Sequence, residues 1–377
     1  MSETAVSKSI WGRLYNGQTS FDFYGKRRIG FGLSLVVIVV SLVSLFTRGI
    51  NLGIDFEGGV AWQVPATATM DIDAARGVLE DNGIDTASAK VQTLTSGSQE
   101  FVRLQVGDQP LETRTKVQQE LAEKAGLESS DVSVSSVSSS WGRTITEKAV
   151  RALVIFLVLV SMFIAWRFEW RMAAAAILAM VHDVLISVGV YSLTGFEVTP
   201  ATIVAFLTIL GFSLYDTIVV FDKVQDNVKR FSGTRTPVAD IVNVSANQVL
   251  MRSLNTSLAA ILPVLSLLVL GSEILGAIAL REFSLALLVG VTTGAYSSVY
   301  IATPLFAIFK EREAKYSSLR GTHLTGAALQ QMVVTGLPAG NRAVKRVEAS
   351  SGEVQSTDAT ASAVLTHPPR PRKKRRR

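Results

Sequence analysis

Apolar residues along the chain gather into six windows, each long enough to cross a bilayer, which takes roughly 20 residues. The windows lie at about 29–46, 149–166, 172–193, 199–221, 257–275 and 283–309. The third holds His182 and Asp183, so hydropathy supports it less strongly, and the last is long enough to tilt. The pattern predicts a polytopic α-helical membrane protein with six transmembrane helices, the first over 29–48 and helices 2–6 over 147–309.

Between the first two windows, residues 49–146 read as a small α+β domain. Apolar and polar positions alternate at Val102, Leu104 and Val106, as in a half-buried strand. Further strands are expected over 60–64, 89–94 and 132–134, and helices over 72–82, capped by Asp71, and 111–126. The order β-α-β-β-α-β is the ferredoxin-like split βαβ arrangement.

Charge predicts the orientation of the helices. Lys and Arg gather before the first window, between the second and third, between the fourth and fifth, and after the last. By the positive-inside rule both termini are cytoplasmic and the α+β domain is extracytoplasmic. Residues 1–28 then form a cytoplasmic N-terminal segment. These residues are mostly polar and no cleavage site follows them closely, so the first helix is expected to stay as an anchor.

The stretch 310–377 is basic, with 14 Lys or Arg against 5 Asp or Glu. Most of it lacks periodicity, so a disordered cytoplasmic tail is expected. A basic segment beside a membrane helix most often meets anionic lipid. RNA is a second candidate partner, but a charge run is weak support for it, and no specific nucleic acid is predicted.

Composition removes several kinds of chemistry. The chain has no Cys and three His, which excludes thiolate sites and gives no metal-ligand cluster. Gly53 and Gly58 have the spacing of a nucleotide-binding loop, but Gly59 stands where that loop needs Lys. We therefore expect no enzyme activity, cofactor or metal. Energy for any work must come from a partner or an ion gradient.

Polar residues inside the apolar windows are the strongest signal. Asp216 lies near the inner end of the fourth window, and Ser213 and Thr217 share its helix face. A carboxylate at the centre of a membrane helix costs about 2.5–3.5 kcal/mol on insertion scales, and such residues usually mark an ion or proton path. His182 and Asp183 form either an interhelical hydrogen-bonded pair or part of such a path.

A second polar stripe enters the fifth helix, where Ser245, Gln248, Arg252 and Asn255 recur at helical spacing. Arg252 is near the membrane boundary, so it either snorkels to the surface or pairs with Asp216. Such a pair is compatible with both a structural ion pair and a proton relay, because arginine stays charged and tunes the carboxylate.

The sixth helix carries small residues at Gly290, Gly294 and Ser298. This spacing lets another helix approach closely, which predicts helix packing. Together with a relay that has only one acid in the fourth helix, it also predicts that the chain is half of a heteromeric assembly.

Four strings carry a resemblance to a known family. They are Gly-Ile-Asp-Phe-Glu-Gly-Gly at 53–59, Gly-Phe-Ser-Leu-Tyr-Asp-Thr-Ile-Val-Val-Phe-Asp at 211–222, Ser-Ala-Asn-Gln-Val-Leu-Met-Arg-Ser at 245–253 and Gly-Ala-Tyr-Ser-Ser at 294–298. The chain resembles the SecF family of prokaryotic protein-export subunits over about 11–309. Residue 215 is often Asn in that family and is Tyr here.

The resemblance implies a function. SecF and SecD resemble two halves of a proton-driven transporter of the resistance-nodulation-division superfamily. In the plasma (inner) membrane such a pair is expected to use the proton motive force to promote late-stage preprotein translocation through SecYEG, after SecA has acted, with a YajC-type subunit as a further partner. The family's membrane acid and arginine match Asp216 and Arg252, and the other carboxylate of the relay belongs to SecD.

Two alternatives have different functions. One is a stand-alone proton-coupled exporter of small molecules, against which a chain with only six helices speaks. The other is a non-transporting scaffold that holds SecD and SecYEG together, which should tolerate Asp216→Asn.

Overall fold

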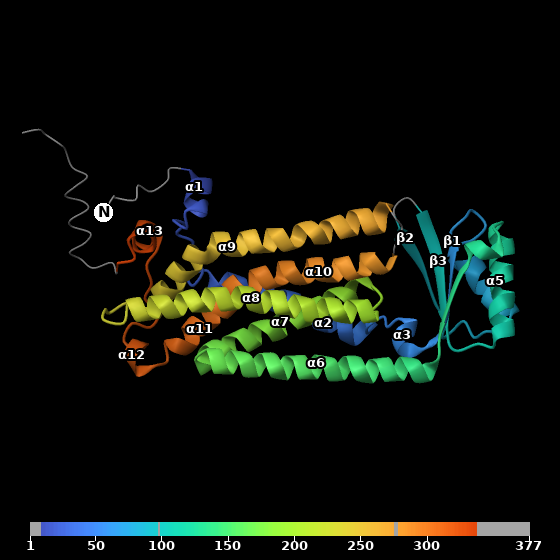
Figure 1. Cartoon of the computed structure of the whole chain (residues 1–377), viewed down its shortest axis with the longest axis horizontal. Helices are drawn as coiled ribbons and strands as arrows, with labels where there is room; N and C mark the ends of the chain where they lie inside the picture. Colours follow the sequence, from blue (N-terminus) through green and yellow to red (C-terminus); the bar gives the residue numbers. More distant parts are fainter. Residues whose placement is uncertain (1–8, 97–98, 275–277, 338–377) are drawn as a thin grey trace, which may run out of the picture. The chain divides into compact units, whose positions relative to one another are not determined.

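The computed structural model describes residues 9–96, 99–274 and 278–337 (Figure 1). Within these ranges, six helical segments are long and apolar enough to span a membrane, which confirms the predicted fold class. They are α2 (Arg27–Arg48), α6 (Ser139–Arg167), α7 (Trp170–Thr194), α8 (Pro200–Arg230), α9 (Val238–Ser266) with the π-helical η2 (Leu267–Ile274), and α10 (Ile278–Ser297) with the π-helical η3 (Ser298–Ala302) and α11 (Thr303–Lys310).

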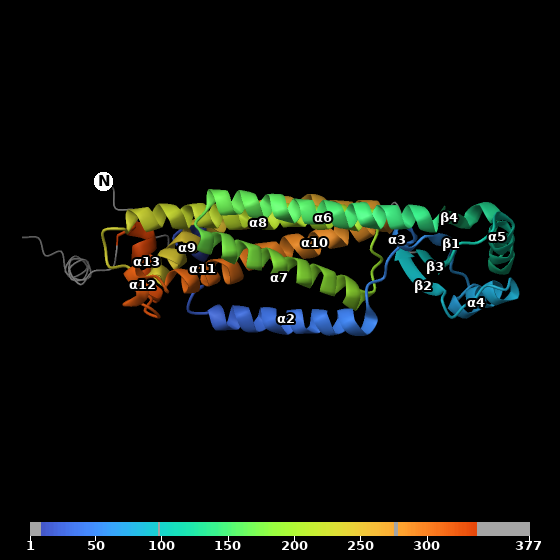
Figure 2. The ribbon, with the colours of Figure 1, turned by 90° about the horizontal axis from the view of Figure 1, so that it is seen from below.

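Helices α7, α8 and α10 form the buried centre of the bundle, and α2 lies along α7 (Figure 2). The small residues predicted to allow close packing do so within the chain. A methyl group at Gly290 would lie 2.2 Å from Ile209 Cγ2, and one at Gly294 would lie 2.8 Å from Ser213 Cβ, both on α8. The glycines therefore bring α10 against α8, and they give no support to a heteromeric assembly.

Helix α6 and the apolar, second half of α9 behave differently, because few of their side chains are buried on this chain. Their large exposed apolar side chains are mostly Leu, Val and Ile. In a membrane such faces contact lipid or another membrane helix. Helix α9 also begins at Val238, well before the apolar window at 257, because its first half is buried by neighbouring segments.

The α+β domain has the strand order predicted for a ferredoxin-like fold. Its elements are α3 (Ile54–Glu57), β1 (Gly59–Pro65), α4 (Ile72–Asp81), β2 (Lys90–Ser96), β3 (Gln99–Val106), α5 (Leu111–Ala125), η1 (Ser129–Asp131) and β4 (Ser133–Val137). The sheet is antiparallel with order β2-β3-β1-β4. As predicted, the Asp71 side chain caps α4 by accepting from Ala74 N at 2.7 Å, and Val102, Leu104 and Val106 are buried.

Two glycines fix this domain to α6. Gly58 and Gly59 have φ of +78° and +115°, a region that L side chains rarely adopt. A Cβ at Gly58 would lie 2.6 Å from Ser139 Cα, and one at Gly59 would lie 2.1 Å from Val106 O. At these two glycines the chain turns while it is packed directly against the backbone of Ser139 and Val106. The start of β1 is therefore held tightly against the start of α6.

The expected disordered tail differs from the structure over 310–337. Helix α12 (Ala314–Ser317) is followed by α13 (Gly326–Thr335), which is packed against α8 and α9. Leu329, Met332 and Val333 recur at i, i+3 and i+4 and are buried against Phe231, Ile241 and Val244. This apolar face is short, which is why the polar surroundings hid it. The basic run at 338–377 lies outside the described residues.

The N-terminal segment is also folded onto α9, after the short α1 (Ile10–Tyr15). Phe21 N and Tyr24 N donate to the Asn247 and Asn243 side chains at 2.8 and 2.9 Å. Tyr24 Oη donates to Glu311 Oε2 at 2.9 Å, and burial raises the pKa of Tyr24 to about 12. The hydroxyl group therefore stays protonated, and its hydrogen bond links the segment before α2 to the segment after α11.

Candidate functional site

Asp183 is the centre of a fully buried polar network on α7. Its Oδ2 accepts hydrogen bonds from Ser213 on α8 at 2.5 Å and from Ser297 on α10 at 2.7 Å. Its Oδ1 lies 2.9 Å from His182 Nδ1. Asp183 therefore joins the three central helices, and both carboxylate oxygens have a partner.

His182 continues this network to α2. Its Nε2 lies 3.0 Å from Ser34 Oγ. Ser34 Oγ in turn lies 3.3 Å from Tyr296 Oη, which donates to Gly30 O at 2.9 Å. Of the two interpretations of His182 and Asp183, the interhelical hydrogen-bonded pair is present in the structure. Hydrogen-bonded chains of this kind also carry protons, so the pair is compatible with a role in proton movement.

Asp216 lies one turn further along α8 than Ser213, and it is also buried. Its Oδ2 accepts a hydrogen bond from Ser298. Ser253 on α9 is buried beside the same carboxyl group, but its hydroxyl makes no hydrogen bond with acceptable geometry among the described residues. Thr217 is buried on the same helix. Asp216 is thus surrounded by hydroxyl groups.

The two acids have hydrogen-bond partners that are adjacent along the chain. Ser213 and Asp216 share a face of α8, and Ser297 and Ser298 are neighbours where α10 passes into η3. Ser213 and Ser297 donate hydrogen bonds to Asp183, and Ser298 donates one to Asp216. Consecutive residues of a helix point about 100° apart, so Ser297 and Ser298 reach different acids. Asp183 and Asp216 thus lie in two neighbouring hydrogen-bonded clusters, and no hydrogen bond joins the two clusters in the described residues.

The expected ion pair between Asp216 and Arg252 is absent from the described part of the chain. The Arg252 guanidinium instead donates to Tyr215 Oη at 3.3 Å. Arg252 is exposed, as is Tyr215, so both point toward the surface of the bundle. Of the two alternatives for Arg252, the exposed position is the one present in the structure. Helical spacing fixes a face of α9 but not the rotation of α9 relative to α8, so spacing could not decide between them.

The polar stripe on α9 divides into two parts. Ser245 is buried, and Asn227 Nδ2 donates to its Oγ at 2.8 Å and to Gln248 Oε1 at 3.1 Å. This part links α9 to α8. Arg252 and Asn255 are exposed on the membrane-spanning part of the helix. Exposed polar residues at this depth are expensive in lipid, so a second membrane helix is the expected cover.

Several of these polar residues were missed from the sequence, namely Ser34, Asn227, Ser253, Tyr296 and Ser297. Asn227 follows Asp216 by eleven residues, which is three turns of the same face, so periodicity alone would have found it. Ser297 stands beside the predicted Ser298. Ser34 and Tyr296 lie on helices whose pairing with α7 no local pattern shows.

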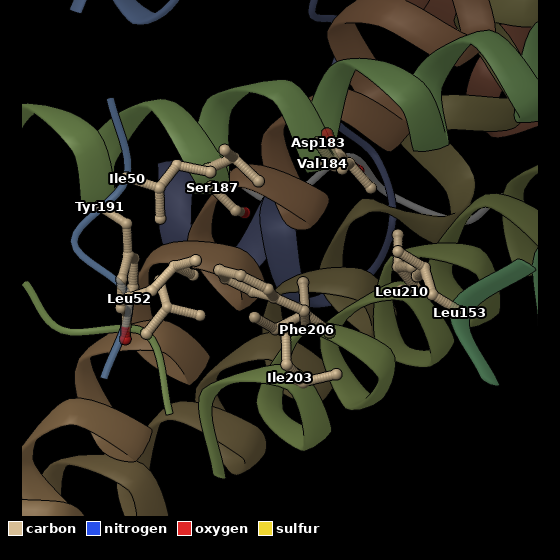
Figure 3. A pocket seen from close by; sticks show the side chains of 13 residues that line it. Ile50, Leu52, Leu153, Asp183, Val184, Ser187, Tyr191, Ile203, Phe206 and Leu210 are labelled. Atoms are coloured by element: carbon tan, nitrogen blue, oxygen red, sulfur yellow. The ribbon is translucent and has the colours of Figure 1, made fainter. Parts of the chain in front are cut away.

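An apolar cavity of about 190 Å³ leads to Asp183 (Figure 3). It extends from Tyr191 and Leu52, at the end of the bundle near the α+β domain, to Asp183. The Ser187 hydroxyl lines it and is buried without a partner among the described residues. No group of three or more His, Asp or Glu within the described ranges has the arrangement of a metal site.

Comparison with known proteins first defines a class. Residues 116–312 match the family described as protein export membrane protein SecD/SecF, C-terminal, and residues 43–64 match the SecD/SecF GG motif. These matches include the glycine turn at Gly58 and Gly59, the network around Asp183, and Asp216. The chain is thus a multi-pass membrane protein of the SecD/SecF class.

Individual relatives show to which family within this class the chain belongs. The chain is 40% identical to the protein translocase subunit SecF of Streptomyces coelicolor, covering 83% of each protein, and 41% identical to SecF of Mycobacterium tuberculosis, covering 81% of this chain and 70% of that one. The crystal structure of SecDF from Thermus thermophilus aligns with a TM-score of 0.70 at 34% identity, over 78% of this chain and 39% of that one. The chain belongs to the SecF family, and its relatives support a role in protein export.

Proposed function

We propose that the chain is a proton-carrying subunit that works with a SecD-type partner and uses the proton motive force to promote late-stage preprotein translocation through SecYEG. The observation that carries this proposal is the position of Asp216. It is buried inside a membrane-spanning bundle, and its hydrogen-bond partner is a hydroxyl rather than a cation. A permanent charge is costly in such a place, whereas a carboxyl group that gains and loses a proton is suited to it.

The surface beside Asp216 supports the need for a partner. Arg252, Asn255 and Tyr215 form an exposed polar patch where lipid would be expected. In a single-chain relative from Thermus thermophilus named SecDF, the part similar to this chain is 39% of the protein. A SecD-type chain that covers this patch would place its own carboxylate near Arg252, and in that complex Arg252 would balance charges from both chains.

The proposed path of the proton uses the groups already described. The cavity beside Tyr191 and Ser187 leads from the α+β end of the bundle to Asp183. From Asp183 the proton would pass to Asp216 by way of the hydroxyl groups of Ser213, Ser297 and Ser298, each of which donates to one of the two acids. A hydroxyl can accept one proton while donating another, so these serines are suited to relay.

The available energy is sufficient for a conformational step. A proton that crosses 100 mV releases about 2.3 kcal/mol, and a one-unit pH difference adds about 1.4 kcal/mol. A change of charge at Asp216 alters its hydrogen bond with Ser298, which follows the close α8–α10 contact at Gly290 and Gly294. Helix packing can then differ between the two protonation states.

Location and further partners follow from the same proposal. We expect both termini to lie in the cytoplasm of a prokaryotic cell and the α+β domain outside its inner membrane, because the basic ends of the helices favour the cytoplasmic side. SecA and a YajC-type subunit are expected to act with the same translocon. The basic tail is expected to contact anionic lipid.

The test is gradient-dependent release of a preprotein from membrane vesicles that contain the complete complex. Asp216→Asn keeps the size and hydrogen-bonding capacity of the side chain but does not titrate. We expect it to assemble with its partner and to lose the release that depends on an imposed proton gradient. Asp222→Asn is the matched control, because Asp222 is exposed and paired with Arg167 at 2.8 Å. Full gradient-dependent release by Asp216→Asn would favour the scaffold alternative.

A further inference from the structure

A second group of buried charges lies where the α+β domain meets the membrane helices. A cavity of about 390 Å³ separates strand β2 from the loop between α7 and α8 and from the start of α10. Strand β2 is an edge of the sheet, and side chains tie it to its surroundings, since Arg281 on α10 donates to Thr95 O and Asn51 Nδ2 donates to Gln92 Oε1 at 3.4 Å. The opposite side is tied to α6 through Gly58 and Gly59.

Glu197 is the most deeply buried charge at this junction. Its side chain is 2% exposed and lines the cavity. Oε1 accepts from Arg103 Nη2 on strand β3 at 3.0 Å. Oε2 is buried and has no hydrogen-bond partner in the described part of the chain. A buried, half-satisfied carboxylate is an expensive arrangement unless a proton or another donor completes it.

The position of Glu197 is specified by the surrounding backbone. A Cβ at Gly53 would lie 2.5 Å from Glu197 Oε1, so the glycine makes room for the carboxylate. Gly53 N also donates to Val198 O at 3.0 Å, and Val198 N donates to Asn51 O at 2.8 Å. The segment before the α+β domain and the α7–α8 loop therefore form one rigid cradle around this side chain.

The charges that face Glu197 come from every element packed around it. With Glu197 itself, four carboxylates and three cations gather here. The other carboxylates are Asp55 and Glu57 on α3 and Glu282 on α10, and the cations are Arg103 on β3, Lys90 on β2 and Arg281 on α10. Glu57 and Lys90 already pair with each other at 2.8 Å in an exposed position. Glu282 is buried and lines the same cavity as Glu197, so the two carboxylates repel each other when both are charged.

Burial has the largest effect on the pKa of the Glu197 carboxyl group. It raises the pKa of the Glu197 carboxyl above the usual range, and the nearby Arg103 only partly opposes it. When the domain edge moves away, water reaches the carboxyl and its pKa returns toward the ordinary value.

We propose that Glu197 is a second proton-binding residue of this subunit and that its proton holds the β2–β3 edge of the α+β domain against the membrane helices. This inference rests on the proposed function and extends it from the membrane to the domain outside. Proton uptake at Glu197 closes the edge. Loss of that proton charges the cluster and favours opening, with α3 and the start of α6 as the fixed side.

The direction of the pH effect follows from linkage. The pKa is higher in the closed form than in the open form, so the closed form binds the proton more tightly. Closure is favoured at low pH and is lost as the pH rises through the pKa of the closed form. A simple ion pair between Glu197 and Arg103 would give the opposite sign, since protonation would break it.

The test is a distance measurement by electron paramagnetic resonance on the complete complex in nanodiscs. The chain has no native cysteine, so labels at Ala87→Cys beside β2 and Leu193→Cys at the end of α7 are the only ones on this subunit. With a cysteine-free partner, we expect one short distance at low pH and a growing longer one as the pH rises. Glu197→Gln, which is neutral at every pH, should stay at the short distance throughout.

Glu100→Gln is the matched control, because it makes the same chemical change on an exposed carboxylate of strand β3 that has no ion pair among the described residues. It should keep the pH dependence of the parent chain. Opening of Glu197→Gln with rising pH, or opening of the parent chain on acidification, would overturn the proposal.

Asp216→Asn separates this inference from the proposed function. Its distances should still change with pH, because Glu197 is intact, while its gradient-dependent release is lost. If release survives in Asp216→Asn, the proposed function fails. If release is lost but Glu197→Gln opens with pH like the parent chain, only the inference about Glu197 fails.

Discussion

Asp183 and Asp216 are two buried carboxylates in one helix bundle, and they differ in how completely the chain surrounds them. Asp183 has partners on both oxygens, drawn from α7, α8 and α10. Asp216 has Ser298 as its hydrogen-bond partner in the described residues, and the arginine expected beside it turns to Tyr215. Both sites are buried, so exposure does not explain the difference.

This difference in hydrogen bonding indicates which of the two sites the proposed partner chain would complete. A fully hydrogen-bonded buried group holds one geometry and resists rearrangement. A partly satisfied one has a lower barrier to change and is suited to a group that must alter its charge. Asp183 therefore fixes the three central helices, while Asp216 and the exposed patch at Arg252 are the part of the bundle where we propose that the partner makes contact.

The largest effect is expected from Asp183→Leu. It removes the acceptor of Ser213 and Ser297 and leaves His182 without its nearest partner, which should lower the free energy of unfolding by about 2–4 kcal/mol. Ser187→Ala is the control, since Ser187 lies one turn away and has no partner. Thermal unfolding monitored by size exclusion measures both. Equal stability of the two variants would show that the Asp183 network is not structural.

Gly294→Leu should act on both sites together. A side chain at Gly294 meets Ser213 and forces α10 away from α8, at a cost of about 1–3 kcal/mol. Gly211→Ala is the control, because a Cβ at Gly211 meets nothing within 4 Å. We expect Gly294→Leu to lose both stability and gradient-dependent release. Normal release would contradict the assigned α8–α10 contact.

A smaller and more selective effect is expected at the exposed patch. Arg252→Met should leave the isolated chain as stable as before, because its guanidinium is exposed and makes one long hydrogen bond. In the complex it should weaken co-purification with the SecD-type partner and reduce gradient-dependent release. If Arg252→Met destabilises the isolated chain as strongly as Asp183→Leu, the patch is structural rather than an interface.

Tyr215→Phe should have the smallest effect of this set. It removes only the hydroxyl that Arg252 contacts at 3.3 Å, so we expect less than about 0.5 kcal/mol in stability, in line with surface substitutions. Release should fall by less than in Arg252→Met. A loss as large as that of Arg252→Met would mean that Tyr215 itself completes the site.

The sequence predicted the parts of the fold that depend on local periodicity. The alternation at Val102, Leu104 and Val106, the cap at Asp71 and the six apolar windows each reflect contacts close along the chain. Whether Arg252 pairs with Asp216 or reaches the surface could not be decided from the sequence, because it depends on how α8 and α9 rotate against each other.

The other features that were not predicted from the sequence have similar causes. The link from His182 to Ser34 joins helices separated by most of the α+β domain, so no sequence spacing shows it. The packed helix at 326–335 has a single apolar face of three residues, too short to stand out among polar neighbours. The half-satisfied state of Glu197 depends on a loop, a strand and a helix that meet only in the folded chain.

The most direct test of the account is whether Asp216 itself changes protonation. Infrared difference spectroscopy of the complete complex, recorded between acidic and alkaline buffer, reports carboxyl groups that gain or lose a proton. The account predicts a carboxyl band in the parent complex that is missing in Asp216→Asn and present in Asp222→Asn. A difference spectrum of Asp216→Asn that matches the parent in every carboxyl band would contradict it.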